Sequence, residues 1–179
     1  MRNLSVLVIE ESDAEGEIVA QILKGLGVNR VAQFRGAEAG LAHLSREAVD
    51  LVIVAAVLPG LDGYAFTSRL RLSRHMPGRA APVILLTTQT RLADVALARD
   101  SGVTWVVAKP VTQKTLFKAM SVLAQDDRHR VGSRRGRPTP GSARIATEWK
   151  SEGPNPGSAV APGNMSQAEI DALLMPATV

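Results

Sequence analysis

The stretch LVIVAAVLPGLDG, residues 51–63, decides the fold of this chain. Its opening residues, 51–54, are all apolar, and three of the four are β-branched. A short run of this kind has the length and composition of a strand that is buried on both faces of a sheet. Such a strand needs covering helices on both sides of its sheet, and the rest of the sequence supplies helical patterns for this role.

Four more short runs rich in β-branched residues lie at residues 4–9, 28–34, 83–86 and 105–107. Amphipathic segments separate the runs. The first segment places Ile18, Val19, Ile22, Leu23 and Leu26 on one face, and the last does the same with Leu116, Met120 and Leu123. This alternation predicts an α/β domain over residues 1–125, built as a (βα)5 doubly wound parallel five-stranded sheet.

The bulk composition limits the classes of function. The chain has 179 residues, 45% of them hydrophobic, and no cysteine, which excludes disulfides and thiolate metal sites. The first apolar run, 4–9, is too short to cross a membrane, and no cleavage site follows it. We therefore expect no signal peptide, no membrane segment and a cytoplasmic protein. The net charge of +4 permits weak attraction to nucleic acid without requiring it.

Residues 126–164 change in character. Half of the ten prolines lie here among glycines and serines, and no apolar period survives. A segment of this composition cannot bury enough surface to offset its backbone entropy, which predicts a disordered linker. Its first part is basic and contains Arg128, Arg130, Arg134, Arg135 and Arg137.

Residues 165–176 predict a short amphipathic recognition helix. Ser166 and Glu169 have the spacing of a capping box, and Met165 and Ile170 occupy the flanking staple positions. The apolar face consists of Ile170, Leu173 and Leu174, and Pro176 ends the pattern. A helix this short is unstable alone in water, so we expect it to fold against a partner.

Four landmarks stand at the ends of the predicted strands. They are the acidic pair Glu10 and Glu11, the stretch 58–63, Thr87 and Lys109 with its following proline. In this order they resemble the response-regulator receiver family, which has the CheY-like, flavodoxin-like fold, over residues 3–124. The resemblance implies that an acidic pair and a third-strand aspartate hold Mg²⁺, that the aspartate accepts a phosphoryl group, and that the Thr and Lys contact its oxygens.

The third-strand position departs from that family pattern, because it holds Ala55. A methyl group is neither a nucleophile nor a metal ligand, so we expect a degenerate phosphorylation site with no metal and no cofactor. Asp50 lies about 16 Å away along the strand and is no substitute. Asp62, on the following loop, is kept as an alternative acceptor. Glu10 or Glu11 is expected to pair with Lys109 instead of binding a metal.

The position that matches the family's aromatic switch on the fifth strand is Val106. Valine cannot perform the swing that the resemblance assigns to an aromatic ring. Trp105, one residue earlier, should point to the opposite face of the sheet and serve in packing. Ala55 and Val106 together predict a domain that is held in one state.

The decapeptide 165–174 resembles the N-terminal peptide of the flagellar motor-switch protein FliM, which is the docking element for CheY-like receivers. The resemblance implies that Ile170, Leu173 and Leu174 enter a groove on the fourth-helix, fifth-strand, fifth-helix face of a receiver. Glu169 and Asp171 would meet basic residues there. Docking on this chain's own receiver is the alternative, and we expect Val106 to oppose it because the aromatic that shapes the groove is missing.

These patterns predict a non-enzymatic signalling adaptor of the two-component or chemotaxis type. Its helix at 165–176 would bind a phosphorylated CheY-like receiver, in trans or in cis, and its receiver domain a histidine kinase or another receiver. Nucleic-acid binding through the arginine-rich linker is the alternative, which the absence of a base-reading fold makes the weaker one. The three histidines lack metal-ligand spacing, and no nucleophile–base set points to an enzyme.

Overall fold

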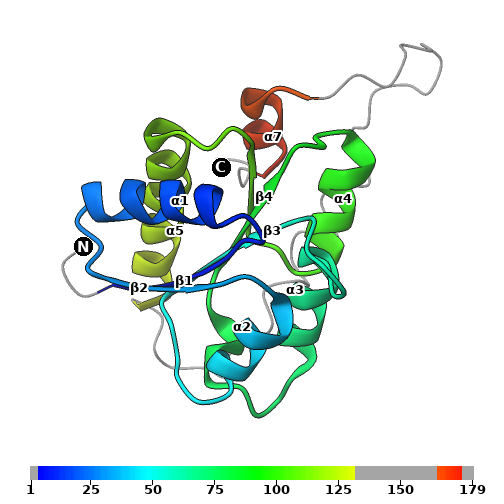
Figure 1. Cartoon of the computed structure of the whole chain (residues 1–179). Helices are drawn as coiled ribbons and strands as arrows, with labels where there is room; N and C mark the ends of the chain where they lie inside the picture. The colour runs from blue at the N-terminus through cyan, green and yellow to red at the C-terminus, as the bar shows by residue number, and fades with distance from the viewer. Residues whose placement is uncertain (1–3, 132–164, 175–179) are drawn as a thin grey trace.

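The computed structural model describes residues 4–131 and 165–174 (Figure 1). Strands alternate with helices along most of the chain. In order, the elements are β1 Ser5–Ile9, α1 Asp13–Gly25, β2 Arg30–Phe34, α2 Ala37–Leu44, β3 Leu51–Ala55, α3 Gly63–Leu72, the 3-10 turn η1 Pro77–Ala80, β4 Val83–Thr87, α4 Leu92–Asp100, β5 Trp105–Ala108, α5 Gln113–Val131 and α7 Gln167–Leu174. The predicted strand runs are confirmed to within two residues at each end.

The five strands form one parallel sheet in the order β2-β1-β3-β4-β5. The direction of the strand order reverses between β1 and β3. These two strands pair with each other, although β2 lies between them in the sequence. The predicted (βα)5 doubly wound fold is therefore confirmed. In such a sheet the loops at the carboxyl ends of the central strands build the functional site, and β5 is left as an edge strand.

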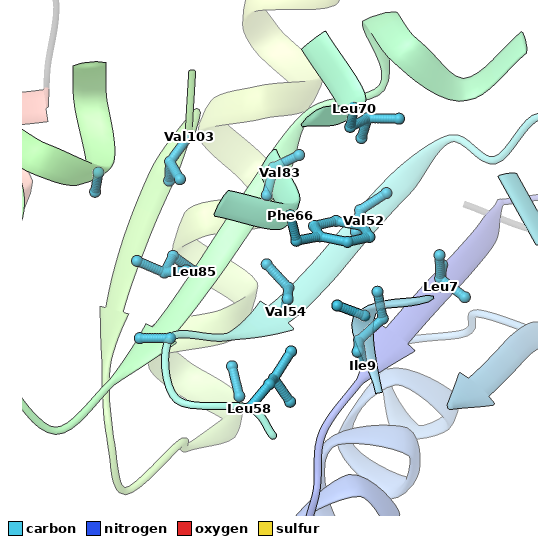
Figure 2. Packing of buried hydrophobic residues seen from close by; sticks show 14 of the residues in the cluster. Leu7, Ile9, Val52, Val54, Leu58, Phe66, Leu70, Val83, Leu85 and Val103 are labelled. Atoms are coloured by element: carbon cyan, nitrogen blue, oxygen red, sulfur yellow. The ribbon is translucent and has the colours of Figure 1, made fainter. Parts of the chain in front are cut away.

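Helices cover both faces of the sheet. One hydrophobic cluster joins the sheet to α2, α3 and α4 around Phe66, which is fully buried (Figure 2). A second cluster joins the other face to α1 and α5 and contains Trp105. Val106 belongs to the first cluster, so these two neighbours point to opposite faces as predicted.

Side-chain caps begin several of the helices, among them α1 and α3. Ser12 accepts a hydrogen bond from the Glu15 backbone N–H at the start of α1, and Asp62 accepts from Ala65 at the start of α3. The apolar face predicted for α1 needs one correction, because Ile18 is 52% exposed whereas Val19 and Leu23 are buried. Position 18 satisfies the helical period but lies at the solvent side of that stripe.

Helix α5 continues to Val131, six residues past the predicted domain boundary at 125. The first two linker arginines, Arg128 and Arg130, therefore lie on a helix. The helical pattern overrides the composition signal here, because the first Gly of the segment comes only at position 132. The remaining linker arginines and Pro176 lie outside the described residues, so the disordered linker and the nucleic-acid alternative stay predictions.

No helix within residues 4–131 and 165–174 is long and apolar enough to cross a membrane.

Candidate functional site

Strands β1, β3, β4 and β5 all end at one edge of the sheet, because the sheet is parallel. This edge gathers the predicted landmark residues Glu10, Ala55, Thr87 and Lys109. Glu10 follows β1, Ala55 and Thr87 end their strands, and Lys109 follows β5. In the receiver family that the sequence resembles, the phosphorylation site lies at this end of the sheet.

Lys109 is held by carboxylates instead of facing an open site. Its ammonium group lies 2.8 Å from the Glu10 carboxylate, whose side chain is 5% exposed, and it also pairs with Glu15 from the first turn of α1. Burial disfavours the charged lysine, but the hydrogen bonds to the two glutamates more than offset this and raise the pKa of Lys109. The predicted pairing of Lys109 with the acidic pair is therefore made by Glu10. Glu11 is exposed, and Glu15 was not predicted.

Ala55, at the end of β3, is buried and only 1% exposed. The start of α3 packs tightly against it: a Cβ on Gly63 would come 2.3 Å from the Ala55 carbonyl oxygen. No carboxylate replaces the missing one, and among the residues that the structure describes no group of three His, Asp or Glu side chains could hold a metal. With Glu10 engaged by Lys109, the donor set that Mg²⁺ requires does not fit this edge.

The two aspartates weighed as substitutes both have structural partners. Asp62 caps α3 by accepting from Ala65 at 2.7 Å. Asp50 lies at the opposite end of the sheet, where it accepts hydrogen bonds from the backbone and hydroxyl of Ser5. Thr87 is buried, and its hydroxyl is bonded within its own loop, accepting from the Gln89 N–H and donating to the Gln89 carbonyl.

Helix α7 lies across the edge strand β5 of this chain's own receiver, between α4 and α5 (Figure 1). Its capping box forms as predicted: the Glu169 carboxylate accepts from the Ser166 backbone N–H at 2.7 Å, and the Ser166 hydroxyl accepts from the Glu169 N–H at 3.3 Å. The hydrogen bonds from the Ser166 backbone and hydroxyl lower the pKa of Glu169 below its usual value. The backbone groups at the start of this short helix are thus satisfied by its own cap.

The apolar face of α7 enters the receiver core. Ile170 is fully buried in the cluster that contains Val106, and Met165, Leu173 and Leu174 pack against the same cluster. The expectation that Val106 opposes docking in cis is therefore wrong, because Val106 and Ile170 belong to the same buried cluster.

Polar contacts fix the position of α7. Met165 donates its N–H to the Thr90 carbonyl at 2.8 Å, and the Thr90 hydroxyl donates back to the Met165 carbonyl at 2.6 Å. The buried Asp171 pairs with Lys118 on α5 at 2.5 Å. The predicted basic partner of Asp171 is thus present in cis, whereas the bonds of Glu169 to the described residues lie within its own cap.

Gln167 was missed by the sequence analysis. Its carboxamide oxygen accepts from the Ala108 N–H at 2.6 Å, and its nitrogen donates to the Val106 carbonyl at 3.0 Å and to Asp171 at 2.7 Å. Glu15, Thr90 and Lys118 were missed as well. A signal existed for Gln167, because it lies three residues before Ile170 on the face that the apolar period marks as buried.

Comparisons with known proteins agree with the fold of residues 4–131. The model of the "Response regulator receiver domain" family matches residues 6–121. The transcriptional regulatory protein AfsQ1 of Streptomyces coelicolor is 32% identical over 130 residues, which are 72% of this chain and 55% of AfsQ1. Protein PilH of Pseudomonas aeruginosa is 27% identical over 118 residues, 66% of this chain and 95% of PilH.

Among solved structures, the signal receiver domain of an HD-domain-containing protein from Pseudomonas fluorescens is similar, with a TM-score of 0.62 and 27% identity. The similarity covers 72% of this chain and 99% of that one. This chain spans only about half of AfsQ1 and 18% of the sensory/regulatory protein RpfC of Xanthomonas campestris, so those proteins contain further regions.

Proposed function

Because this chain belongs to the response-regulator receiver family, we propose that it is a non-enzymatic signalling adaptor of the two-component or chemotaxis type. Its receiver domain is not phosphorylated at the usual position. Its output comes from α7, which docks on the α4–β5–α5 face of a CheY-like receiver, either its own or that of another chain. The observation that carries the proposal is α7 itself, seated on that face with Ile170 fully buried.

The residues at the carboxyl ends of β1, β3, β4 and β5 support a role without phosphoryl transfer. A receiver needs a carboxylate at the end of β3 to form the acyl phosphate, and Ala55 offers none. Lys109, which would meet the phosphoryl group, is already neutralised by Glu10 and Glu15. An incoming phosphoryl donor would have to displace two carboxylates and would find no nucleophile behind them.

The reach of the chain supports docking in cis. We take residues 132–166, which connect α5 to α7, as the linker predicted from the sequence, and a flexible chain of 35 residues has a root-mean-square span of about 30 Å. Such a tether gives an effective concentration of about a millimolar. Even a helix that binds with a dissociation constant on the order of 10 µM is then docked in about 99% of molecules.

The same arithmetic defines when α7 acts in trans. A second receiver displaces the intramolecular contact only when its concentration divided by its dissociation constant approaches that ratio of about 100. An activated CheY-like receiver with a better-shaped groove meets this condition more easily than an inactive one. The adaptor would then sequester the activated form and modulate motility or another phosphorelay, while a histidine kinase or a further receiver engages its own receiver domain.

Capture of receivers by the full-length chain tests this function. The immobilised chain is mixed with a CheY-like receiver with and without acetyl phosphate and Mg²⁺, and the retained receiver is quantified. The matched comparison is the chain with Ile170→Asp, which places a charge on the apolar face of α7. We expect more of the activated receiver to be retained, and only by the unaltered chain. Equal retention of both forms, or undiminished retention by Ile170→Asp, would contradict the proposal.

A further inference from the structure

The contacts of Gln167 show how α7 identifies its site. In a parallel sheet a residue facing an edge strand donates its N–H to the carbonyl of one residue and accepts the N–H of the residue two positions on. The Gln167 carboxamide makes this pair of bonds with the Val106 carbonyl and the Ala108 N–H. One side chain thus reproduces both hydrogen bonds of a parallel bridge opposite Val107.

These backbone groups are free in the sheet itself. Among the described strands, β5 pairs with β4 alone, and the Lys109 N–H donates to the Thr87 carbonyl. By the alternation of a parallel ladder, Trp105 and Val107 face β4 as well. The alternate residues Val106 and Ala108 point their backbone groups away from the sheet, as on any edge strand. When α7 lies over this edge it shields these groups from water, so they require a partner.

From these contacts we infer that Gln167 binds α7 to the backbone of a receiver's edge strand β5, and that α7 therefore binds receivers as a class instead of one cognate partner. The inference rests on the proposed function and deepens it. Backbone donors and acceptors at β5 belong to every receiver in which β5 is the free edge, whatever its side chains. The contact between Met165 and the Thr90 carbonyl is likewise to the backbone.

Apart from the Thr90 hydroxyl, which donates to the Met165 carbonyl, side-chain recognition is then reduced to two requirements. One is a cation at the position of Lys118 on α5, because Asp171 is buried and pairs with it. The other is room for Ile170 beside the residue at position 106. Receivers that carry a lysine there should bind α7 most tightly, and receivers without one should bind it more weakly but in the same orientation.

Gln167 also organises the helix for this task. Its amide nitrogen donates to Asp171 one turn later as well as to Val106, so the carboxylate that meets Lys118 is oriented by the residue that meets β5. Gln167→Met keeps the length and helix preference of the side chain but can make none of these bonds. This substitution therefore removes the contact with the β5 backbone while it preserves the tendency of residues 167–174 to form a helix.

The first test measures amide hydrogen exchange in the full-length chain. In the unaltered protein the Ala108 N–H is covered by Gln167, and we expect it to exchange slowly. In Gln167→Met we expect Ala108 and the α7 amides to exchange at least tenfold faster, because both hydrogen bonds to β5, each of ordinary net strength, are lost together with the bond to Asp171. Ala172→Met places the same side chain on the exposed face of α7 and should change neither. Unchanged exchange at Ala108 in Gln167→Met would overturn the inference.

The second test uses synthetic peptides of residues 163–179 and three single-domain receivers from different pathways, at least one of them without the α5 lysine. We expect Gln167→Met to weaken binding to all three by a similar factor, about tenfold or more. Asp171→Asn should weaken binding only to receivers that have the lysine. A Gln167→Met effect confined to one receiver would refute recognition of the backbone. If the unaltered tail is unprotected in the full chain and its peptide binds no receiver, the proposed function itself fails.

Discussion

Truncation of Ile170 to alanine should open the contact between α7 and its receiver. Ile170 is the fully buried member of the apolar face of α7 and lies in the cluster that joins the sheet to α2, α3 and α4. Replacing a fully buried isoleucine by alanine costs about 2–5 kcal/mol, from lost burial and from the cavity that remains. This loss falls on the docked state alone, because the released helix already exposes the side chain to water.

The effect can be compared with the strength of docking in cis. A dissociation constant on the order of 10 µM and a millimolar effective concentration correspond to about 2.7 kcal/mol in favour of the docked state. A loss of about 2 kcal/mol would leave roughly one molecule in five open, and a loss of about 3 kcal/mol would leave more than half open. Ile170→Ala should therefore release α7 in at least about a fifth of the molecules, and in most of them when the loss exceeds about 3 kcal/mol.

Amide hydrogen exchange with mass spectrometry measures the change directly. Peptides that cover α7 and β5 should lose protection in Ile170→Ala, whereas peptides from β1 and β3 should keep theirs. Ile18→Ala, the same substitution at the half-exposed isoleucine of α1, is the matched control and should leave α7 protected. Full protection of α7 in Ile170→Ala would refute the account of docking, and a loss of protection throughout the sheet would show that α7 is part of the folding core.

Three further predictions concern charged groups. Lys109→Met leaves Glu10 buried without its cation, which should lower the free energy of unfolding by about 3 kcal/mol in urea titrations. Because the pKa of Lys109 is raised in the fold, its contribution should be complete below its ordinary pKa of 10.5 and lost as the pH rises above it, and a stability profile that is flat there would count against the pairing. Asp171→Asn should weaken docking of α7 about tenfold and remove its salt dependence, because the contact with Lys118 is charge-assisted; fluorescence anisotropy of a labelled tail measures both. Arg71→Met should destabilise the domain by about 2 kcal/mol or more in thermal unfolding, because the guanidinium donates to three backbone carbonyls.

The sequence predicted most of the fold because its signals were local and agreed with one another. The apolar runs and helical periods located every strand to within two residues, and the capping box at Ser166 formed as expected. The end of α5 was missed, because basic composition was taken as a sign of disorder although no helix breaker occurs before position 132.

The candidate site could be predicted only in part, because its pairs join distant parts of the chain. The sequence identified Lys109 and the acidic pair but not Glu15, which lies in the first turn of α1, 94 positions from the lysine. It named Asp171 but not Lys118, which lies 53 positions away. The sequence suggested that Val106 would oppose docking in cis. Only the packed core shows that Ile170 and Val106 belong to one buried cluster.

The central claim is that this receiver signals by docking and takes no phosphoryl group at the end of β3. The most direct test is the intact mass of the purified chain after incubation with acetyl phosphate and Mg²⁺, with a phosphorylatable CheY-like receiver treated in parallel. We predict no acyl phosphate on this chain while the other receiver is modified. One phosphoryl group per chain on a carboxylate, at Asp62 or at any other residue of the edge that holds Ala55, would contradict the account.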